Sequence, residues 1–278
     1  MYDILISSPA LNNEKSNQYI LSIQISLDGF SFSVCDSISN KFIYLTHKPF
    51  TKNTTIVEQT NDILNSDTLL NLKYKNVYIA LDLKPSTLIP KVLFDETQKE
   101  LYYSKNYKIE ANNKVYYDTI KLYDSVNLYT VDEALELSLK THFGNPKISH
   151  INSVKTQLIT AHPETKHTVY LTMRDTKFSI IVLNSKTIVL QNAYSYSNVD
   201  EFLYFFLYCF NQLNLDPLNT PVEIDGILPK HSSIVKQLER FIKKIAFANW
   251  PESHNFANDF YDMPSHYFTY LYQNILCE

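Results

Sequence analysis

Glycine content limits the phosphate chemistry that this chain can support. The chain contains three glycines, Gly29, Gly144 and Gly226, whereas an average usage of ~7% would supply about 19. Loops that cradle phosphates need glycine, because backbone N–H groups approach the ligand closely only where no Cβ stands in the way. Neither GxGxxG nor GxxxxGK[ST] occurs. The sequence therefore disfavours Rossmann dinucleotide-binding, P-loop and protein-kinase sites.

Two polar turns and one isolated glycine are the remaining candidates for binding a metal or a phosphate. Asp28 and Gly29 lie between two β-rich runs. Asp-Gly in that position is among the strongest hairpin-turn signals, and the alternative interpretation is a metal–phosphate turn. The segment Arg174–Lys177 is either a charged hairpin tip or a second phosphate loop. Gly226 either relieves a bend at the end of a strand or lets the backbone approach an adenine.

Other enzyme classes have weaker support. A ribonuclease-H nuclease needs three or four carboxylates around two Mg²⁺ ions. Asp28 lies near the first predicted strand, and Asp82 and Asp225 lie on later strands, but the three could not all converge within one of the two repeats. No histidine pair has HxxxH or HExxH spacing, and no Gly-x-Ser-x-Gly elbow occurs. We therefore expect no metal site and no serine-hydrolase site.

Chain length, net charge and the longest apolar run limit the classes of protein to which this chain can belong. The 278 residues suit two domains of roughly 100–150 residues each. A net charge of −4 gives no overall attraction for nucleic acid or for an anionic membrane. The longest apolar run, Phe202–Phe210, is far shorter than the roughly 20 residues that span a bilayer. We expect no nucleic-acid partner and no membrane insertion, and we interpret this run as a buried helix, with an interaction surface as the alternative.

The cysteines and the N-terminal residues predict a soluble, cytoplasmic protein. Cys35, Cys209 and Cys277 are far apart and show no CxxC spacing. Three unpaired cysteines are typical of free thiols in a reducing compartment. The N-terminal residues lack a basic segment followed by an apolar one, so we expect no secretory signal.

The elements that would position these candidates follow an order that occurs twice. The first copy is predicted to contain strands at Tyr19–Ser26, Phe30–Asp36 and Phe42–Thr46, a helix at Thr54–Leu72 and a buried strand at Val77–Leu83. The second copy is predicted to contain strands at Thr168–Met173, Phe178–Leu183 and Thr187–Gln191, a helix at Asp200–Leu215, a strand at Pro221–Leu228 and a closing helix at Ser233–Phe247. This recurrence predicts an internal duplication with Asp28 and Asp175 at equivalent hairpin turns.

The rest of the chain is assigned around these two copies. Residues 86–131 are predicted to form an inserted subdomain, followed by a helix at Asp132–Phe143 and a strand near Ile148–Val154. We expect a first lobe over residues 1–160 and a second lobe over residues 161–250. Near the C-terminus, helical spacing predicts one apolar stripe that consists of Phe268, Leu271, Tyr272 and Ile275.

Repeat order and one turn sequence support a family resemblance. Three antiparallel strands, a crossover helix and a further strand describe the ribonuclease-H-like fold, and two such units in tandem resemble the actin-like ATPases. With the turn ISLDGFSFSV (Ile25–Val34), the whole chain is more narrowly similar to a Bacteroidetes family of unknown function. The resemblance implies an α/β fold of two βββαβα units with mixed sheets. It also implies that residues 251–278 pack back on the first lobe.

The same resemblance implies where a nucleotide would bind. In actin-like ATPases an Asp-x-Gly turn in each copy orders hydrated Mg²⁺ and holds phosphate, and a Gly-Gly turn lies near the adenosine. In this chain the matching positions are Asp28 and Gly29, then Asp175 and Thr176, and finally Gly226, with Asp28 and Asp175 catalytic if the site is active. The second copy lacks the turn glycine, and the adenosine turn has one glycine instead of two. We interpret the site as eroded and expect no cofactor beyond weakly bound Mg-ATP.

Two hypotheses for function follow. The first is a non-catalytic actin-like scaffold, a pseudoenzyme whose lobes bind protein partners. The second is a divergent Mg-ATP-binding ATPase or phosphotransferase with its site in the interlobe cleft, built on Asp28 and Asp175. The shortage of glycine favours the first hypothesis. Partner identity and oligomeric state are not predicted.

Overall fold

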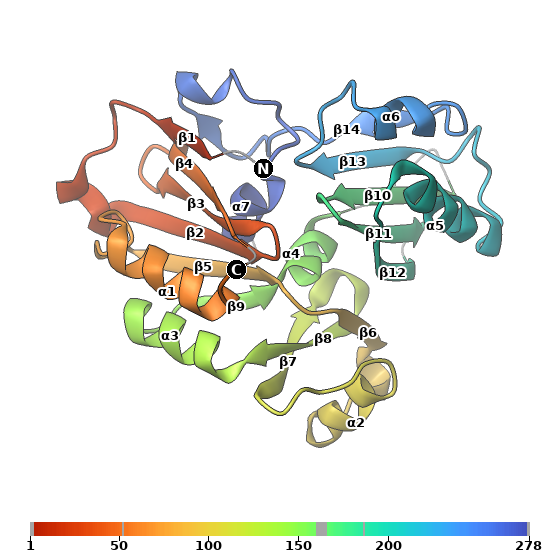
Figure 1. The fold of residues 1–278 in the computed structure, drawn as a ribbon, viewed down its shortest axis with the longest axis horizontal. Helices are drawn as coiled ribbons and strands as arrows, with labels where there is room; N and C mark the ends of the chain where they lie inside the picture. Colours follow the sequence, from red (N-terminus) through yellow and green to blue (C-terminus); the bar gives the residue numbers. More distant parts are fainter. Residues whose placement is uncertain (1–2, 52, 160–165, 186, 277–278) are drawn as a thin grey trace. The chain divides into compact units, whose positions relative to one another are not determined.

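Two compact units make up the chain in the computed structural model, which describes residues 3–51, 53–159, 166–185 and 187–276. Unit 1 comprises residues 1–158, 251–263 and 270–278, and unit 2 comprises residues 159–250 and 264–269. Each unit is built on a mixed β-sheet with helices against it (Figure 1). The predicted α/β fold with mixed sheets is confirmed.

The main sheet of unit 1 has the strand order β1-β4-β3-β2-β5-β9, and β15 pairs with β4. Its strands are β1 (Ile4–Ser7), β2 (Tyr19–Ser26), β3 (Gly29–Asp36), β4 (Lys41–Pro49), β5 (Asn76–Asp82), β9 (Lys147–His150) and β15 (Asn255–Phe256). The β2, β3 and β4 strands are antiparallel neighbours, whereas β5 runs parallel to β2 and β9 parallel to β5. Because the side chains of a strand alternate between its faces, Leu21, Ile23 and Ile25 all enter one core.

Two helices cover that core face of the sheet, α1 (Ile56–Ser66) and α3 (Glu133–Phe143), as Figure 1 shows. Thr55 and Glu58 form a capping box at the start of α1, and the Asp132 carboxylate accepts two backbone N–H bonds at the start of α3. The remaining helices of the N-terminal part are α2 (Lys99–Ser104) and α4 (Ile151–Leu158), with 3₁₀ turns η1 (Asn13–Gln18), η2 (Lys91–Leu93), η3 (Glu96–Gln98) and η4 (Lys121–Tyr123).

A separate three-stranded sheet is inserted in the chain between β5 and α3. Its order is β6-β8-β7, and its strands are β6 (Ser86–Pro90), β7 (Asn113–Ile120) and β8 (Ser125–Asp132). Both neighbouring pairs are antiparallel. The α2 helix covers this sheet through a small core of its own, formed by Tyr103, Val115, Val126 and Leu128.

The sheet of unit 2 repeats the strand order of unit 1. Its order is β12-β11-β10-β13-β14, with strands β10 (His167–Met173), β11 (Lys177–Asn184), β12 (Thr187–Ser195), β13 (Val222–Gly226) and β14 (Ile245–Phe247). The sense of each pairing matches that of β4-β3-β2-β5-β9 in unit 1. The predicted duplication is therefore confirmed at the level of topology.

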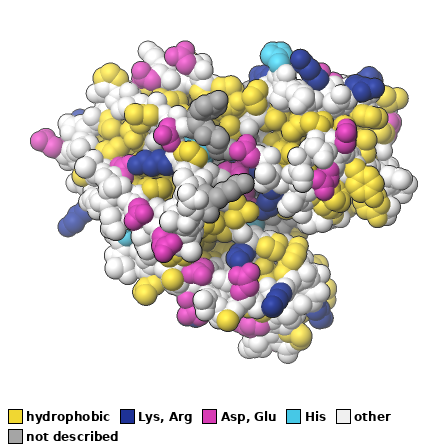
Figure 2. Space-filling model, in the orientation of Figure 1, with side chains coloured by type: hydrophobic (Ala, Val, Ile, Leu, Met, Phe, Trp, Pro, Cys, Tyr) yellow, Lys and Arg dark blue, Asp and Glu magenta, His cyan; other side chains and the backbone are white. Residues whose placement is uncertain are grey.

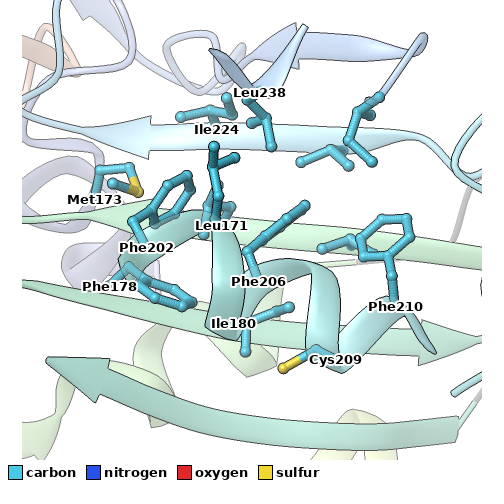
Figure 3. Close-up of a cluster of buried hydrophobic side chains, with 14 of the residues drawn as sticks. Leu171, Met173, Phe178, Ile180, Phe202, Phe206, Cys209, Phe210, Ile224 and Leu238 are labelled. Carbon is cyan, nitrogen blue, oxygen red and sulfur yellow. The ribbon is translucent and has the colours of Figure 1, made fainter. Parts of the chain in front are cut away.

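The core of unit 2 lies between its sheet and the helix α5 (Val199–Gln212). Phe202, Phe206 and Phe210 point from α5 toward the strands, where Leu171 and Ile180 lie (Figure 3). The predicted burial of Phe202–Phe210 is thus confirmed for one face of the helix. On the other face, Tyr204 and Tyr208 remain exposed, because a helix of this length turns only part of its surface toward a single sheet.

Two predicted elements were wrong. The segment predicted as a strand near Ile148–Val154 is the short strand β9 followed by α4, which brings Ile151 and Val154 onto one helical face against Ala80 and Tyr270. The closing helix predicted at Ser233–Phe247 is α6 (Ser233–Leu238), followed by β14, which pairs in parallel with β13. Short apolar runs fit the periodicity of a helix and that of a strand equally well. The residues of β14 form a strand because they pair with β13.

The C-terminal stripe was also predicted incorrectly in part. Phe268 has a φ of 53° and precedes the helix α7 (Thr269–Gln273). Leu271, Tyr272 and Ile275 are buried in unit 1, to which residues 270–278 belong. In the same unit Tyr272 packs edge-on against Phe42 and Phe256. Two 3₁₀ turns complete this region, η5 (Asn258–Phe260) and η6 (Asn274–Leu276).

The described cysteines are buried thiols. Cys35 and Cys209 are free and buried, while Cys277 lies outside the described residues. Burial raises the pKa of the Cys35 thiol to about 12 and also raises that of Cys209, so neither thiol is activated as a nucleophile.

No helix within the described parts of the chain has the length and apolar character needed to cross a membrane.

Candidate functional site

The first predicted turn connects β2 and β3 in unit 1. Leu27 and Asp28 form the two-residue turn between the paired residues Ser26 and Gly29. The Asp28 carbonyl accepts a hydrogen bond from the Phe50 N–H, and the Ser26 hydroxyl donates to the Gly29 carbonyl. Asp28 is half-buried. The hairpin interpretation of this turn is therefore confirmed, and its backbone is held by the protein's own bonds.

Gly29 is needed by the contact between two strands. A Cβ at this position would lie 2.4 Å from the Lys48 carbonyl oxygen and 2.9 Å from the Cα of Pro49, both on β4. Such distances are far inside van der Waals contact. The space that glycine leaves open is therefore occupied by the backbone of β4, which accounts for the residue without any ligand.

The second predicted turn connects β10 and β11 in unit 2. The Arg174 N–H donates to the Lys177 carbonyl, and Asp175 and Thr176 form the exposed two-residue turn between them. Phe178 pairs with Met173 as Phe30 pairs with Ile25. With the hairpins aligned on these pairs, Asp28 matches Thr176, and Asp175 matches Leu27. The two turns are equivalent, but the two aspartates are offset by one residue, a shift that chain spacing alone did not reveal.

Gly226 ends β13 and pairs with Met173 of β10. Its φ is 99°, and a Cβ would lie 2.1 Å from the Met173 carbonyl oxygen. Its N–H donates to the His266 carbonyl, and the Leu228 N–H donates to its carbonyl. Glycine is therefore required by both the backbone angle and the neighbouring strand, which supports the interpretation of a bend at a strand end.

The predicted site residues fall into two groups. Asp28 and Gly29 are adjacent in unit 1, whereas Asp175, Thr176 and Gly226 lie at one end of the sheet in unit 2, because β10 and β13 are parallel and paired. Asp82 lies in unit 1 and Asp225 in unit 2. Across the described residues, no three or more His, Cys, Asp or Glu side chains are grouped so that they could hold a metal ion.

Sequence reasoning missed a polar edge in unit 1. The parallel strands β2, β5 and β9 end at Ser26, Asp82 and His150, and all three residues are buried. Ser26 pairs with Asp82, and Leu81 pairs with His150, so the three strand ends are side by side. Ligands of open α/β sheets bind beyond the carboxyl ends of the strands. The signal was present in the sequence, but the strand that ends at His150 had been predicted to continue to Val154.

His150 is fixed by hydrogen bonds through both ring nitrogens. Its Nδ1 accepts from the Asn152 N–H at 3.1 Å, so Nε2 carries the proton and donates to the Lys84 carbonyl at 3.0 Å. The neutral ring also lies 5.3 Å from the ring of Tyr129. Since both nitrogens are engaged by the backbone, His150 positions the β9–α4 junction and is not arranged as a general base.

Asp118 joins the inserted sheet to that junction. Its carboxylate accepts hydrogen bonds from the His150 N–H at 2.8 Å and from the Tyr129 hydroxyl at 3.1 Å. Burial raises the pKa of Asp118 to about 6, although these bonds and one from Ser153 oppose the shift. Burial and the contact with Asp118 raise the pKa of Tyr129 well above its usual value. Asp118 and Tyr129 therefore form a buried, hydrogen-bonded pair of ionisable groups beside the β9–α4 junction.

A surface depression of unit 1 lies between α1 and α3. It has a volume of about 690 Å³. Asparagine and leucine side chains line much of it, including Asn61, Asn65, Asn71, Leu64, Leu70 and Leu137. Leu137 is 67% exposed. This α1–α3 groove combines apolar contacts with amides that both donate and accept hydrogen bonds.

A family model described as a protein of unknown function (DUF3822) matches residues 8–245. Among curated proteins, none matches this chain. The similarity therefore extends over most of the chain but provides no relative with an assigned activity.

Solved structures show the same fold. A Bacteroides thetaiotaomicron protein with an actin-like ATPase fold and unknown function has a TM-score of 0.83 and 22% identity, covering 96% of this chain and 99% of that one. A chain of the PilM-PilN type IV pilus biogenesis complex has a TM-score of 0.56 and 8% identity, covering 92% of this chain and 97% of that one. The ethanolamine utilization protein EutJ from Carboxydothermus hydrogenoformans has a TM-score of 0.49 and 8% identity, covering 97% and 91%. The fold is that of the actin-like ATPases.

Proposed function

The chain belongs to the DUF3822 family of proteins of unknown function, and we propose that it is a non-catalytic actin-like protein that acts by binding a protein partner. One observation carries this proposal. The space beside Gly29 and Gly226, where a phosphate-binding turn would admit its ligand, is occupied by the carbonyl groups of Lys48 and Met173. Strand packing explains both glycines, which supports a role other than nucleotide binding.

Protein binding is supported by a surface and by a structural neighbour. The α1–α3 groove exposes Leu137 beside several amide side chains, a composition suited to an extended peptide, because amides pair with backbone groups and leucines with apolar side chains. The PilM-PilN structure, which has a similar fold, is a complex of two proteins.

A divergent Mg-ATP-binding ATPase or phosphotransferase is the second candidate. It is favoured by the polar edge of unit 1, where Ser26, Asp82 and His150 end three adjacent strands. A buried aspartate at the carboxyl end of a parallel strand is a common position for a group that orders a metal-bound phosphate. In this alternative Asp28, which is also in unit 1, would contribute from its turn.

Thermal unfolding with and without Mg-ATP separates the two candidates. A ligand at 100 times its Kd adds about 2.7 kcal/mol, which raises the Tm of a domain of this size class by roughly 5–10 °C. We expect millimolar Mg-ATP to leave the Tm within about 1 °C of its value with Mg²⁺ alone.

The control for this measurement is Asp28→Ala. If Mg-ATP raised the Tm of the wild type by several degrees but did not raise that of Asp28→Ala, a nucleotide site at the first turn would be established. The non-catalytic proposal would then be rejected. An equal rise in both proteins would place a site elsewhere and reject it as well.

A further inference from the structure

A polar pocket lies at the amino ends of the parallel strands in unit 2. The β10, β13 and β14 strands are parallel neighbours, so the residues at their starts meet at one edge of the sheet. The pocket has a volume of about 460 Å³, within the roughly 300–1,000 Å³ of small-molecule sites. We name it the amino-edge pocket, and its lining includes Lys166, His167, Asn214, Asp216, Asn219 and Lys244.

Every side chain that lines this pocket is polar, because the one further lining residue is Thr220. The surface over α5 in the same unit is different. Figure 2 shows hydrophobic side chains gathered there, and Tyr204 and Tyr208 are 64% and 48% exposed. A pocket without an apolar side chain favours a ligand that is polar throughout, because an apolar group would gain little by entering it.

Backbone hydrogen bonds hold the walls of the pocket in place. The Val222 N–H donates to the Lys244 carbonyl at 2.8 Å, which ties the residue before β14 to the first residue of β13. In the loop after α5, the Asp216 carbonyl accepts from the Thr220 N–H at 2.8 Å and from the Asn219 N–H at 3.2 Å. A site whose backbone is already ordered loses less conformational entropy when a ligand binds.

The lining side chains carry one more positive charge than negative. Lys166 and Lys244 supply two ammonium groups, and across the described residues neither lysine forms an ion pair. Asp216 supplies one carboxylate, whose pKa is lowered by the hydrogen bond from the Asn219 amide. Burial and the nearby Lys166 lower the pKa of His167, so its ring is neutral at pH 7.5. A ligand with a single negative charge therefore balances the pocket.

The other polar groups of the pocket suit hydroxyl groups. Lysine ammonium groups can only donate, whereas the amides of Asn214 and Asn219 both donate and accept. The Asp216 carboxylate accepts from the Leu218 N–H at 2.9 Å and from the Asn219 amide at 2.6 Å. An ionised carboxylate has about four acceptor positions, so Asp216 can accept further bonds from a ligand.

We propose that the amino-edge pocket binds a small polyhydroxylated monocarboxylate, a sugar acid in chemical class. Its carboxylate contacts Lys166 and Lys244, and its hydroxyl groups donate to Asp216. A doubly charged phosphate ester fits less well, because it would bring excess negative charge next to the Asp216 carboxylate. The proposal is independent of the proposed function, because this pocket belongs to unit 2, whereas the α1–α3 groove and the turn at Asp28 belong to unit 1.

Isothermal titration calorimetry with gluconate tests the ligand class. Gluconate carries a carboxylate and a chain of hydroxyl groups, and we expect a Kd of about 1 mM or lower at pH 7.5. Hexanoate lacks the hydroxyl groups and glucose lacks the carboxylate, so each should bind at least about tenfold more weakly. No binding of gluconate at roughly 10 mM, equal binding of hexanoate, or tighter binding of glucose 6-phosphate would overturn the proposal.

Substitutions locate the site. Lys166→Gln and Lys244→Gln should each raise the Kd for gluconate by roughly tenfold, because each removes a charged donor. Lys243→Gln is the matched control, since Lys243 is exposed and precedes Lys244 but does not line the pocket. Asp216→Asn should change the preference toward glucose 6-phosphate, because the pocket then holds two uncompensated positive charges. If Lys243→Gln weakens binding as much as Lys244→Gln, gluconate does not bind in this pocket and the proposal fails.

The imidazole of His167 reports whether the carboxylate enters the pocket. The charged side chains that line the pocket with His167 are Lys166, Lys244 and Asp216, and its partner on β11, Asn184, is uncharged. Bound gluconate should raise the pKa of His167, because a nearby carboxylate favours the charged ring. Proton NMR titration measures this pKa with saturating gluconate and with sodium chloride at equal ionic strength, and His167→Gln assigns the signal. The same His167 pKa under both conditions would overturn the proposal.

Discussion

Replacing Gly226 with alanine is expected to lower the free energy of unfolding by roughly 3–5 kcal/mol. The backbone φ of 99° is strained for any L side chain, and the new Cβ would lie 2.1 Å from the Met173 carbonyl oxygen. Relief requires β13 to move away from β10, which would disturb the parallel pairing of Met173 with Gly226. Urea unfolding followed by circular dichroism measures the change.

Gly144 supplies the matched control. It also has a positive φ, 78°, at the end of α3, but a Cβ there would meet no atom within 4 Å. Gly144→Ala should therefore lower the free energy of unfolding by the backbone strain alone, roughly 1–2 kcal/mol. If Gly226→Ala proves no more harmful than Gly144→Ala, the strands are not closed around Gly226, and the argument that packing explains this glycine fails.

Replacing Asp118 with asparagine should stabilise the protein at neutral pH and have little effect in acid. The raised pKa of about 6 means that the folded state holds a proton on Asp118 more tightly than the unfolded state does, where the value is near 3.8. The folded protein is thus penalised for ionising this group above about pH 6, and the penalty disappears as the pH falls below the unfolded pKa. Asparagine cannot ionise and avoids the penalty.

The difference in unfolding free energy between Asp118→Asn and wild type should be roughly 2–3 kcal/mol at pH 7.5 and approach zero near pH 4. Urea titrations at half-unit steps of pH between these limits measure it. Asp95→Asn is the control, because a hydrogen bond from Thr97 lowers the pKa of Asp95, so its contribution is lost only below about pH 4. If the difference in unfolding free energy between Asp118→Asn and wild type did not change with pH, the pKa of the Asp118 carboxyl group would be the same in the folded and unfolded states.

The hairpin-connected strands of both units were predictable, because hairpin signals and alternation are local properties of the chain. The turn at Asp28 and the second hairpin at Arg174–Lys177 appear where turn chemistry predicts them. The matching of Asp28 with Thr176 was not predictable, since a one-residue offset between turns is set by strand register and not by spacing along the chain.

Other features depend on contacts between distant residues. The Asp118 carboxylate meets the His150 N–H across 32 positions of sequence, and no local pattern identifies such a partner. The strand β14 exists because β13 offers it an edge, which short-range periodicity does not report. The roles of Gly29 and Gly226 could be assigned only from the position of the neighbouring strand. Sequence alone could therefore identify the shortage of glycine but not show that Gly29 and Gly226 are already accounted for by packing.

Turnover of Mg-ATP by the purified chain tests the central claim most directly. The wild type, Asp28→Ala and the exposed control Asp62→Ala should all release phosphate at the same background rate, because efficient phosphoryl transfer needs donors and metal already placed around the phosphates. A wild-type rate of about 1 s⁻¹ or faster, retained in Asp62→Ala and abolished in Asp28→Ala, would contradict the account and establish the first turn as part of a catalytic site.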